Sequence, residues 1–152
     1  MITALQVPFV HKMDDLYAQL ETSREQGLKL LELLQRGALS GLLKTKIKSV
    51  KQMAAPEKIF LDNPNLMYAF NRNPEIGTIR ETFFYNQVSR AAEVYYPKTG
   101  EFQINDKILI EVGEADKSFN QIKDIPDSYL AIDNVEFGRG NKIPLWLFGF
   151  LY

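Results

Sequence analysis

The pattern of apolar residues from Ile76 onward most constrains the fold that this chain can adopt. Between residues 76 and 92, apolar side chains recur at intervals of three and four, which is the spacing of one face of an α-helix. Short apolar runs of strand length follow, at residues 93–96, 101–104, 107–112 and 128–133. A helix followed by several strands predicts an α/β domain with a mixed sheet flanked by helices.

Two segments near the C-terminus complete this pattern. Residues 117–125 are predicted as a further helix, with Asp116 as its N-cap and Pro126 ending it. The closing run, IPLWLFGFLY, has about half of the ~20 apolar residues that a membrane helix needs. We therefore predict a buried strand there, with Trp146 in the core, and no membrane partner.

The first part of the chain contains a helix with a leucine-rich face. Ser23 and Gln26 form a capping box, and Gly37 ends a helical pattern at residues 24–36. An apolar face of this kind needs a partner surface. We expect it to bind the second domain, another protein or a second copy of the chain.

A domain boundary is predicted near residue 55. Residues 1–55 form the helical segment, and residues 56–152 form the α/β domain. The second domain is expected to begin with a buried strand, KIFL (58–61), and a short helix, NLMYAF (65–70).

Composition excludes several classes of site. The chain has no cysteine and a single histidine, so disulfides, thiolate zinc sites and paired-histidine metal sites are excluded. Any metal would have to be a hard cation, such as Mg²⁺, held by carboxylates. The net charge of -1 gives no general attraction to nucleic acid. The first residues lack the basic and apolar regions of a signal peptide, so a cytoplasmic location is expected.

Four lysines in the first part of the chain offer a local basic patch: Lys44, Lys46, Lys48 and Lys51. The first three alternate, as on an edge strand whose lysines prevent pairing with other chains. The alternative is a ridge that binds the phosphates of a nucleic acid. Few base-reading side chains are interleaved with these lysines, which favours the edge-strand interpretation.

Glu101 and Glu111 carry the strongest indication of chemistry. They lie ten residues apart across a predicted hairpin, and Glu81 on the preceding helix can approach them. Two carboxylates that hold Mg²⁺, with a lysine that orients water, can hydrolyse a phosphodiester. That lysine normally follows the second acid by two residues, because alternate side chains share one face of a strand. Here the position is occupied by Gly113.

Three charged residues near Gly113 affect how the missing lysine is interpreted. Glu114 is expected to repel the two carboxylates. Lys117 is the nearest cation that could replace the lysine, and Lys107 is another. Glu111 lies inside an apolar strand, so it must face a wet cleft or pair with Lys117 or Lys123. The pattern therefore leaves a working site, a vestigial site and a solvated face open.

The other candidate residues also have interpretations without chemistry. Glu101 is explained as a surface residue at the edge of a turn. Glu81 is explained as a cap, since Thr78 and Glu81 would form a capping box if the helix began at residue 78. Gln121 needs no special reason on an exposed helix face.

These features together resemble the PD-(D/E)XK nuclease-like superfamily. More narrowly, the chain resembles the C-terminal region of a bacterial AAA-type ATPase family, which carries a poorly understood nuclease-like domain after its ATPase module. The stretches that carry the resemblance are EKIFLDNPNLMYAF (57–70), IGTIRETFFYNQV (76–88), GEFQINDKILIEVGEADKSFNQIKDI (100–125) and NKIPLWLFGFLY (141–152). The resemblance implies a restriction-endonuclease-like fold at 56–152, after a winged-helix-like segment at 1–55. It also matches Gln121 to a glutamine of nuclease relatives.

The chain departs from that family at its motifs. It has no G-x-x-x-x-G-K-[ST] sequence, so no ATPase activity is expected, and it resembles a truncated or split member. The first acid is Glu101 where nuclease relatives usually carry Asp. Gly113-Glu114-Ala115 stands where close relatives carry Gly-Gly-Lys after the same Glu-Val pair.

Two functions follow from the resemblance and its departures. The favoured one is a non-catalytic module with a degenerate site and no cofactor, which binds protein partners or nucleic acid. The alternative is a Mg²⁺-dependent nuclease that uses Glu101, Glu111 and a migrated lysine. A deep cleft in which these two carboxylates lie within about 5 Å of each other, close enough to share one hard cation, would favour the nuclease, and carboxylates on opposite faces of the sheet would exclude it.

Overall fold

The computed structural model describes residue 29, residues 40–43 and residues 58–151. The chain divides into two compact units, residues 1–75 and residues 76–152. Three predictions lie outside the described residues: the leucine-rich helix (apart from Lys29, whose backbone is helical), the lysines at 44–51 and the domain boundary near residue 55.

The first unit contains a two-stranded sheet and a short helix. Strands β1 (Ser40–Leu43) and β2 (Lys58–Leu61) pair antiparallel. The apolar KIFL sequence forms the buried strand β2, as predicted. Helix α3 (Asn65–Phe70) follows, as predicted, and the side-chain oxygen of Asn63 accepts a hydrogen bond from the backbone N–H of Asn65 before its first turn.

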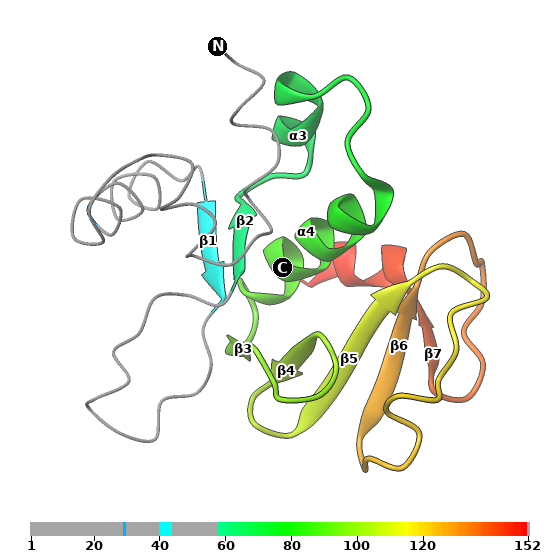
Figure 1. Ribbon diagram of the computed structural model, residues 1–152. Coiled ribbons are helices and arrows are strands. Elements are labelled where there is room, and N and C mark those ends of the chain that lie inside the picture. The colour runs from blue at the N-terminus through cyan, green and yellow to red at the C-terminus, as the bar shows by residue number, and fades with distance from the viewer. Residues whose placement is uncertain (1–28, 30–39, 44–57, 152) are drawn as a thin grey trace. The chain divides into compact units, whose positions relative to one another are not determined.

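The second unit is built on a five-stranded mixed sheet, which confirms the α/β prediction (Figure 1). Its strands follow one another in space as they do along the chain: β3 (Val94–Tyr95), β4 (Phe102–Ile104), β5 (Ile108–Gly113), β6 (Ser128–Ile132) and β7 (Lys142–Pro144). The pairs from β3 to β5 are antiparallel, and those from β5 to β7 are parallel.

A tight turn sets the register between β4 and β5. Asn105 and Asp106 have φ angles of 48° and 59°, and the N–H of Lys107 donates to the carbonyl of Ile104. Two residues in the left-handed region form the hairpin turn that matches the twist of paired strands. Asparagine and aspartate tolerate this region better than other residues with side chains.

Helix α4 (Ile76–Val88) packs against one face of this sheet. The buried ring of Phe84 lies 4.9 Å from the ring of Phe102 on β4, and 4.8 Å from the ring of Phe148 in the 3-10 helix η4 (Leu145–Phe150). Because α4 begins at Ile76, Thr78 lies inside the helix rather than at its cap. The predicted capping box with Glu81 is therefore wrong.

The C-terminal run differs from its prediction. Only Lys142–Pro144 join the sheet, and the next six residues form η4. Proline has no N–H to extend a ladder, so the strand ends at Pro144. The side chains of Trp146 and Phe150 are 49% and 67% exposed, so the prediction of a buried strand with Trp146 in the core is wrong.

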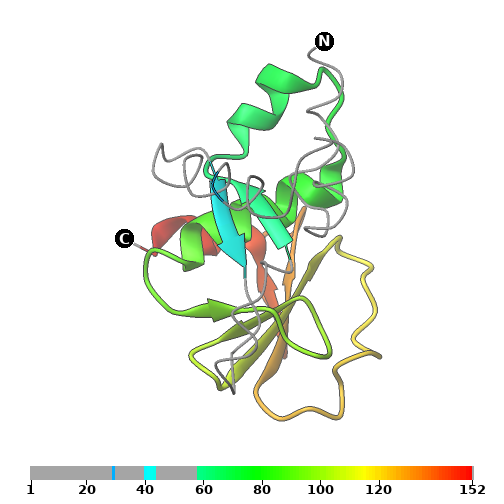
Figure 2. The ribbon, with the colours of Figure 1, turned by 60° about the vertical axis from the view of Figure 1, so that its left-hand side comes forward.

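The connection from β5 to β6 is a series of turns, and the predicted helix at 117–125 is wrong. Its backbone bonds join residues three apart, as from Ile122 N–H to the carbonyl of Phe119. The hydroxyl of Ser118 accepts from the N–H of Asn120, and such local bonds compete with helix formation. Apolar residues of this connection still pack against Leu109, Leu130 and Ile132, and so cover the sheet face opposite α4 (Figure 2).

Candidate functional site

Glu101 and Glu111 occupy neighbouring positions on one face of the sheet. Phe102 pairs with Ile110, and the N–H of Glu101 donates to the carbonyl of Ile110. Extending this register by one residue places Glu101 opposite Glu111, and such cross-strand partners point to the same face. The face is the one opposite α4, since Phe102 contacts that helix.

The Glu101 carboxylate is held by two donors. One oxygen accepts from the backbone N–H of Val112 at 2.6 Å, and the other accepts from the Lys117 ammonium at 2.7 Å. The same ammonium donates to the carbonyl of Val112 at 2.6 Å. Glu101 and Lys117 are thus both fixed to the backbone of the residue after Glu111.

Glu111 is the buried member of this group. Its side chain is 1% exposed, and neither carboxylate oxygen has a hydrogen-bond partner. It lies beside Leu130 on the neighbouring strand, and the Lys117 ammonium is 3.8 Å from one of its oxygens. Burial raises the pKa of Glu111; the charge of Lys117 lowers this pKa and that of Glu101 raises it.

Replacement of Glu111 by Gln is expected to stabilise the metal-free domain at neutral and higher pH. A raised folded-state pKa gives stability that is complete below the ordinary value of 4.5 and is lost as pH rises through the folded value. Removing the buried charge should raise the free energy of unfolding in this pH range, because burial destabilises the ionised carboxylate. Urea unfolding of both proteins from acid to mildly alkaline pH measures this.

The control for this prediction is the exposed residue Glu136, replaced in the same way. Glu136→Gln should leave the pH dependence of unfolding unchanged. A Glu111→Gln protein that is less stable than the wild type above neutral pH would show that the buried carboxylate is favourably paired.

Lys117 fills the space that a side chain at position 113 would need. A Cβ atom built on Gly113 would overlap Cδ of Lys117 and lie 3.1 Å from its Cβ and Cγ. The lysine therefore runs back over Gly113 and delivers its ammonium beside Glu101 and Glu111. From sequence, Gly113 marked a missing lysine; in the structure, the absence of a side chain there makes room for a lysine from four residues later.

The sequence position of Glu114 predicts repulsion of the two carboxylates, but in the structure Glu114 pairs with another residue. Its carboxylate accepts from Nη1 of Arg80 on α4 at 2.9 Å. Nε of Arg80 also donates to Asp133 at 3.0 Å. Arg80 was not among the residues predicted from the sequence, although a charged residue within the apolar pattern of residues 76–92 was a signal for it.

The remaining predicted residues contribute less to this group. Glu81 lies inside α4 and takes no part in the ion pairs that Lys117 makes with described residues. Gln121 and Lys123 are exposed in the β5–β6 connection, and Lys107 follows the hairpin turn. Of the candidate cations, only Lys117 pairs with the two carboxylates within the described residues.

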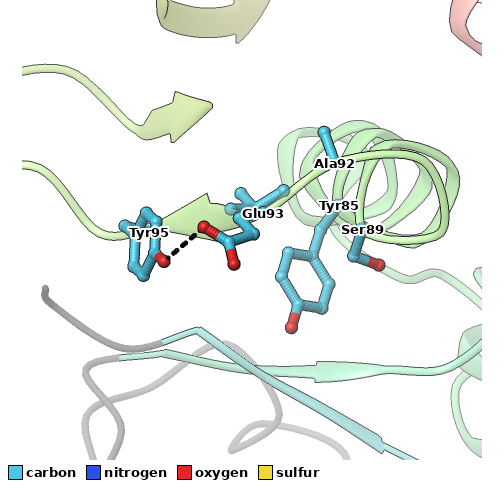
Figure 3. Close-up of a pocket in the computed structure, with 6 residues that line it drawn as sticks. Tyr85, Ser89, Ala92, Glu93 and Tyr95 are labelled. Atoms are coloured by element: carbon cyan, nitrogen blue, oxygen red, sulfur yellow. Dashed lines mark hydrogen bonds between the residues drawn. The ribbon is translucent and has the colours of Figure 1, made fainter. Parts of the chain in front are cut away.

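An open pocket of about 330 Å³ lies elsewhere in this unit, at the end of α4 and the start of β3 (Figure 3). Tyr85 lines it from the helix, and Ser89 lines it from the turn that follows the helix. Tyr95 also lines it, with its hydroxyl donating to Glu93 at 2.8 Å. This hydrogen bond raises the pKa of Tyr95. The pocket shares no lining residue with the Glu101–Glu111–Lys117 group.

The donors around Lys117 fit a hard cation. Mg²⁺ is commonly held by one or two carboxylates, with water and substrate oxygens completing its shell. Residues 58–151 and the described residues before them gather no set of three His, Cys, Asp or Glu side chains. The protein donors would therefore be Glu101, Glu111 and the carbonyl of Val112. The two buried oxygens of Glu111 that lack hydrogen-bond partners support this assignment.

No helix in the described part of the chain is both long and apolar enough to cross a membrane. Comparisons with protein-family models, with curated proteins and with solved structures find no match to this chain.

Proposed function

We propose that residues 76–151 form a divalent-cation-dependent phosphodiesterase domain of the nuclease type, in which Lys117 serves as the site lysine. One observation carries the proposal: Glu101, Glu111 and the carbonyl of Val112 all face the Lys117 ammonium, at 2.7, 3.8 and 2.6 Å. These are the two carboxylates and one lysine that phosphodiester hydrolysis needs, and they lie on one face of the sheet.

Each side chain has a distinct role in this proposal. Glu101, Glu111 and the Val112 carbonyl hold the cation. The bound metal supplies positive charge for a phosphate oxygen and lowers the pKa of a bound water. Lys117 leaves the carboxylates, donates to the attacking water or to a phosphate oxygen, and stabilises the negative charge that develops there.

The buried charge of Glu111 favours a working site over a vestigial one. An ionised carboxylate without hydrogen bonds in an apolar setting costs stability. Such unfavourable groups concentrate where function requires them. The non-catalytic module was favoured because position 113 lacks a lysine and because the net charge is near zero. Lys117 removes the first of these reasons, and a bound cation would supply local positive charge in place of the second.

We also propose that this domain belongs to a protein lineage that carries an ATPase module. The resemblance to the C-terminal region of an AAA-type ATPase family rests on the four stretches quoted above. It supports a nuclease-like domain that acts beside an ATPase module. Without a cation the site holds two carboxylates, Glu101 and Glu111, and one ammonium, Lys117, so phosphate binding should depend on the metal.

Calorimetric titration with Mg²⁺ and Mn²⁺ tests the cation site. We expect saturable binding to the wild type and to Glu136→Gln, and no binding to Glu101→Gln or Glu111→Gln. Single- and double-stranded DNA and RNA, labelled at one end, are then incubated with protein and Mg²⁺. Cleavage by the wild type that disappears in Glu111→Gln is the expected result.

Two results would overturn the proposal at different points. Absence of binding at millimolar metal would remove the cation site and return the domain to a non-catalytic interaction module. Binding without cleavage of any of the four substrates would leave a cation site that is not a nuclease.

A further inference from the structure

Arg80 joins the ends of two neighbouring strands through its side chain. It comes from α4, and its side chain is only 9% exposed. Its two ion pairs reach Glu114, the residue after β5, and Asp133, the residue after β6. The backbone N–H of Asp133 also donates to the carbonyl of Gly113 at 2.8 Å. The ends of β5 and β6 are therefore joined both by this backbone hydrogen bond and by the Arg80 side chain.

Arg80 and Lys117 divide the four nearby carboxylates between them. Arg80 forms ion pairs with Glu114 and Asp133 on the α4 side of the sheet. Lys117 forms ion pairs with Glu101 and Glu111 on the opposite side. Strand alternation accounts for the two sides, because Glu114 directly follows Gly113, which shares the face of Glu111. Glu114 is 61% exposed and only three residues from Lys117. Released from Arg80, it can compete for the lysine.

Glu114 also begins the turn that carries the lysine. Its carbonyl accepts from the backbone N–H of Lys117 at 3.0 Å. From this turn the Lys117 side chain runs back over Gly113 to the carboxylates. The direction of the lysine therefore depends on where Glu114 is held.

We infer that Arg80 is a positioning residue of the proposed hydrolase site. By binding Glu114 and Asp133 together, it fixes the turn at 114–117 and so places the Lys117 ammonium between Glu101 and Glu111. A lysine at position 80 would supply the charge but not the planar, two-sided guanidinium that reaches both acids. The inference rests on the proposed function for its catalytic meaning, while the positioning itself is measurable without metal or substrate.

Nuclear magnetic resonance of the ¹⁵N-labelled protein tests the positioning. The Lys117 ammonium, held by Glu101 and by the Val112 carbonyl, should exchange its hydrogens slowly enough to give a side-chain signal. Loss of that signal in Lys117→Met assigns it. In Arg80→Lys and in Glu114→Gln we expect the signal to disappear or its hydrogen exchange to accelerate about tenfold or more, as expected when a charge-assisted bond is lost.

Two features of the design separate positioning from a general loss of structure. Arg80→Lys leaves a cation near the two acids, and Glu114→Gln alters a largely exposed side chain, so the second variant decides the question if the first does not fold. Arg90→Lys, an exposed arginine just after α4, is the control and should leave the signal unchanged. The backbone amide spectrum of each variant reports whether the sheet is intact.

Kinetics give a second readout where the wild type cleaves. Glu114→Gln should lower kcat about tenfold, while KM stays within about twofold, because the carboxylates that hold the cation are untouched. A Lys117 signal unchanged in both variants would overturn the inference and leave the hydrolase proposal standing. If both variants lose the Lys117 signal and the wild type does not cleave, the positioning role of Arg80 is upheld and the hydrolase proposal is overturned.

Discussion

Replacement of Lys117 by Met is expected to abolish phosphodiester cleavage while preserving metal binding. Methionine keeps the aliphatic chain that lies over Gly113 but removes the ammonium that contacts Glu101 and the Val112 carbonyl. Removing a donor that stabilises developing charge typically costs about 100-fold or more in kcat. A cleavage assay under single-turnover conditions, with protein in excess, measures the loss.

The same variant should bind Mg²⁺ more tightly than the wild type. In the metal-free protein the ammonium occupies the space between the donors and competes with any cation that enters. Without it, two carboxylates face each other with no counter-charge, and the attraction for a divalent ion rises. Calorimetric titration is expected to show an affinity increased by about tenfold, equivalent to roughly 1.4 kcal/mol.

Lys123→Met is the matched control for both effects. Lys123 is exposed in the same connection between β5 and β6, so its loss changes the net charge equally. It should leave cleavage and metal affinity near the wild-type values. Full cleavage by Lys117→Met would show that this lysine is not the site lysine, and a weaker metal affinity would show that it supports the cation site instead of competing with it.

Moving the lysine to position 113 is expected to restore cleavage that Lys117→Ala has lost. Position 113 lies two residues after Glu111 on the same strand, so a side chain there points to the same face. Lys117→Ala removes the Cγ and Cδ atoms that fill this space and leaves one close contact, its Cβ at 3.1 Å. The double variant Gly113→Lys, Lys117→Ala should cleave about tenfold or more faster than Lys117→Ala alone, since one well-placed cation replaces another.

Gly113→Ala in the wild-type background is the converse test. The added Cβ would overlap Cδ of Lys117, so the lysine must leave its place. Cleavage should fall about tenfold, whereas the same change made in Lys117→Ala should have little further effect, which a double-mutant cycle measures. If Gly113→Ala cleaves at the wild-type rate, or if the relocated lysine restores nothing, the two positions are not interchangeable sources of one cation.

The sequence was sufficient where local patterns decide structure. The apolar spacing at 76–92 predicted a helix, which forms over Ile76–Val88 and ends four residues before the pattern does. The short apolar run KIFL forms a strand as predicted. The strands at 102–104, 108–113 and 128–132 also follow their apolar runs closely. Neighbours in the chain determine these elements, so no distant contact was needed to predict them.

Local patterns failed where a distant or competing contact decides. Residues 117–125 have helical spacing, but their apolar side chains cover a sheet face and their polar side chains bond to nearby backbone. The run after Pro144 is apolar enough for a strand, but proline ends the ladder there. In both places the composition was compatible with the predicted element. Packing and local hydrogen bonds favoured turns at 117–125, and the missing N–H of Pro144 ended the strand.

The sequence by itself determined that a metal site here must use carboxylates and that Glu101 and Glu111 are the leading candidates, because the chain has no cysteine and one histidine. Only the tertiary structure decided which cation joins them. Lys117 reaches the carboxylates because a two-residue turn sets the register, a glycine leaves space, and an arginine 34 residues before Glu114 in the chain holds the turn. These contacts join residues far apart in the sequence, and their geometry exists only after the sheet and α4 have packed.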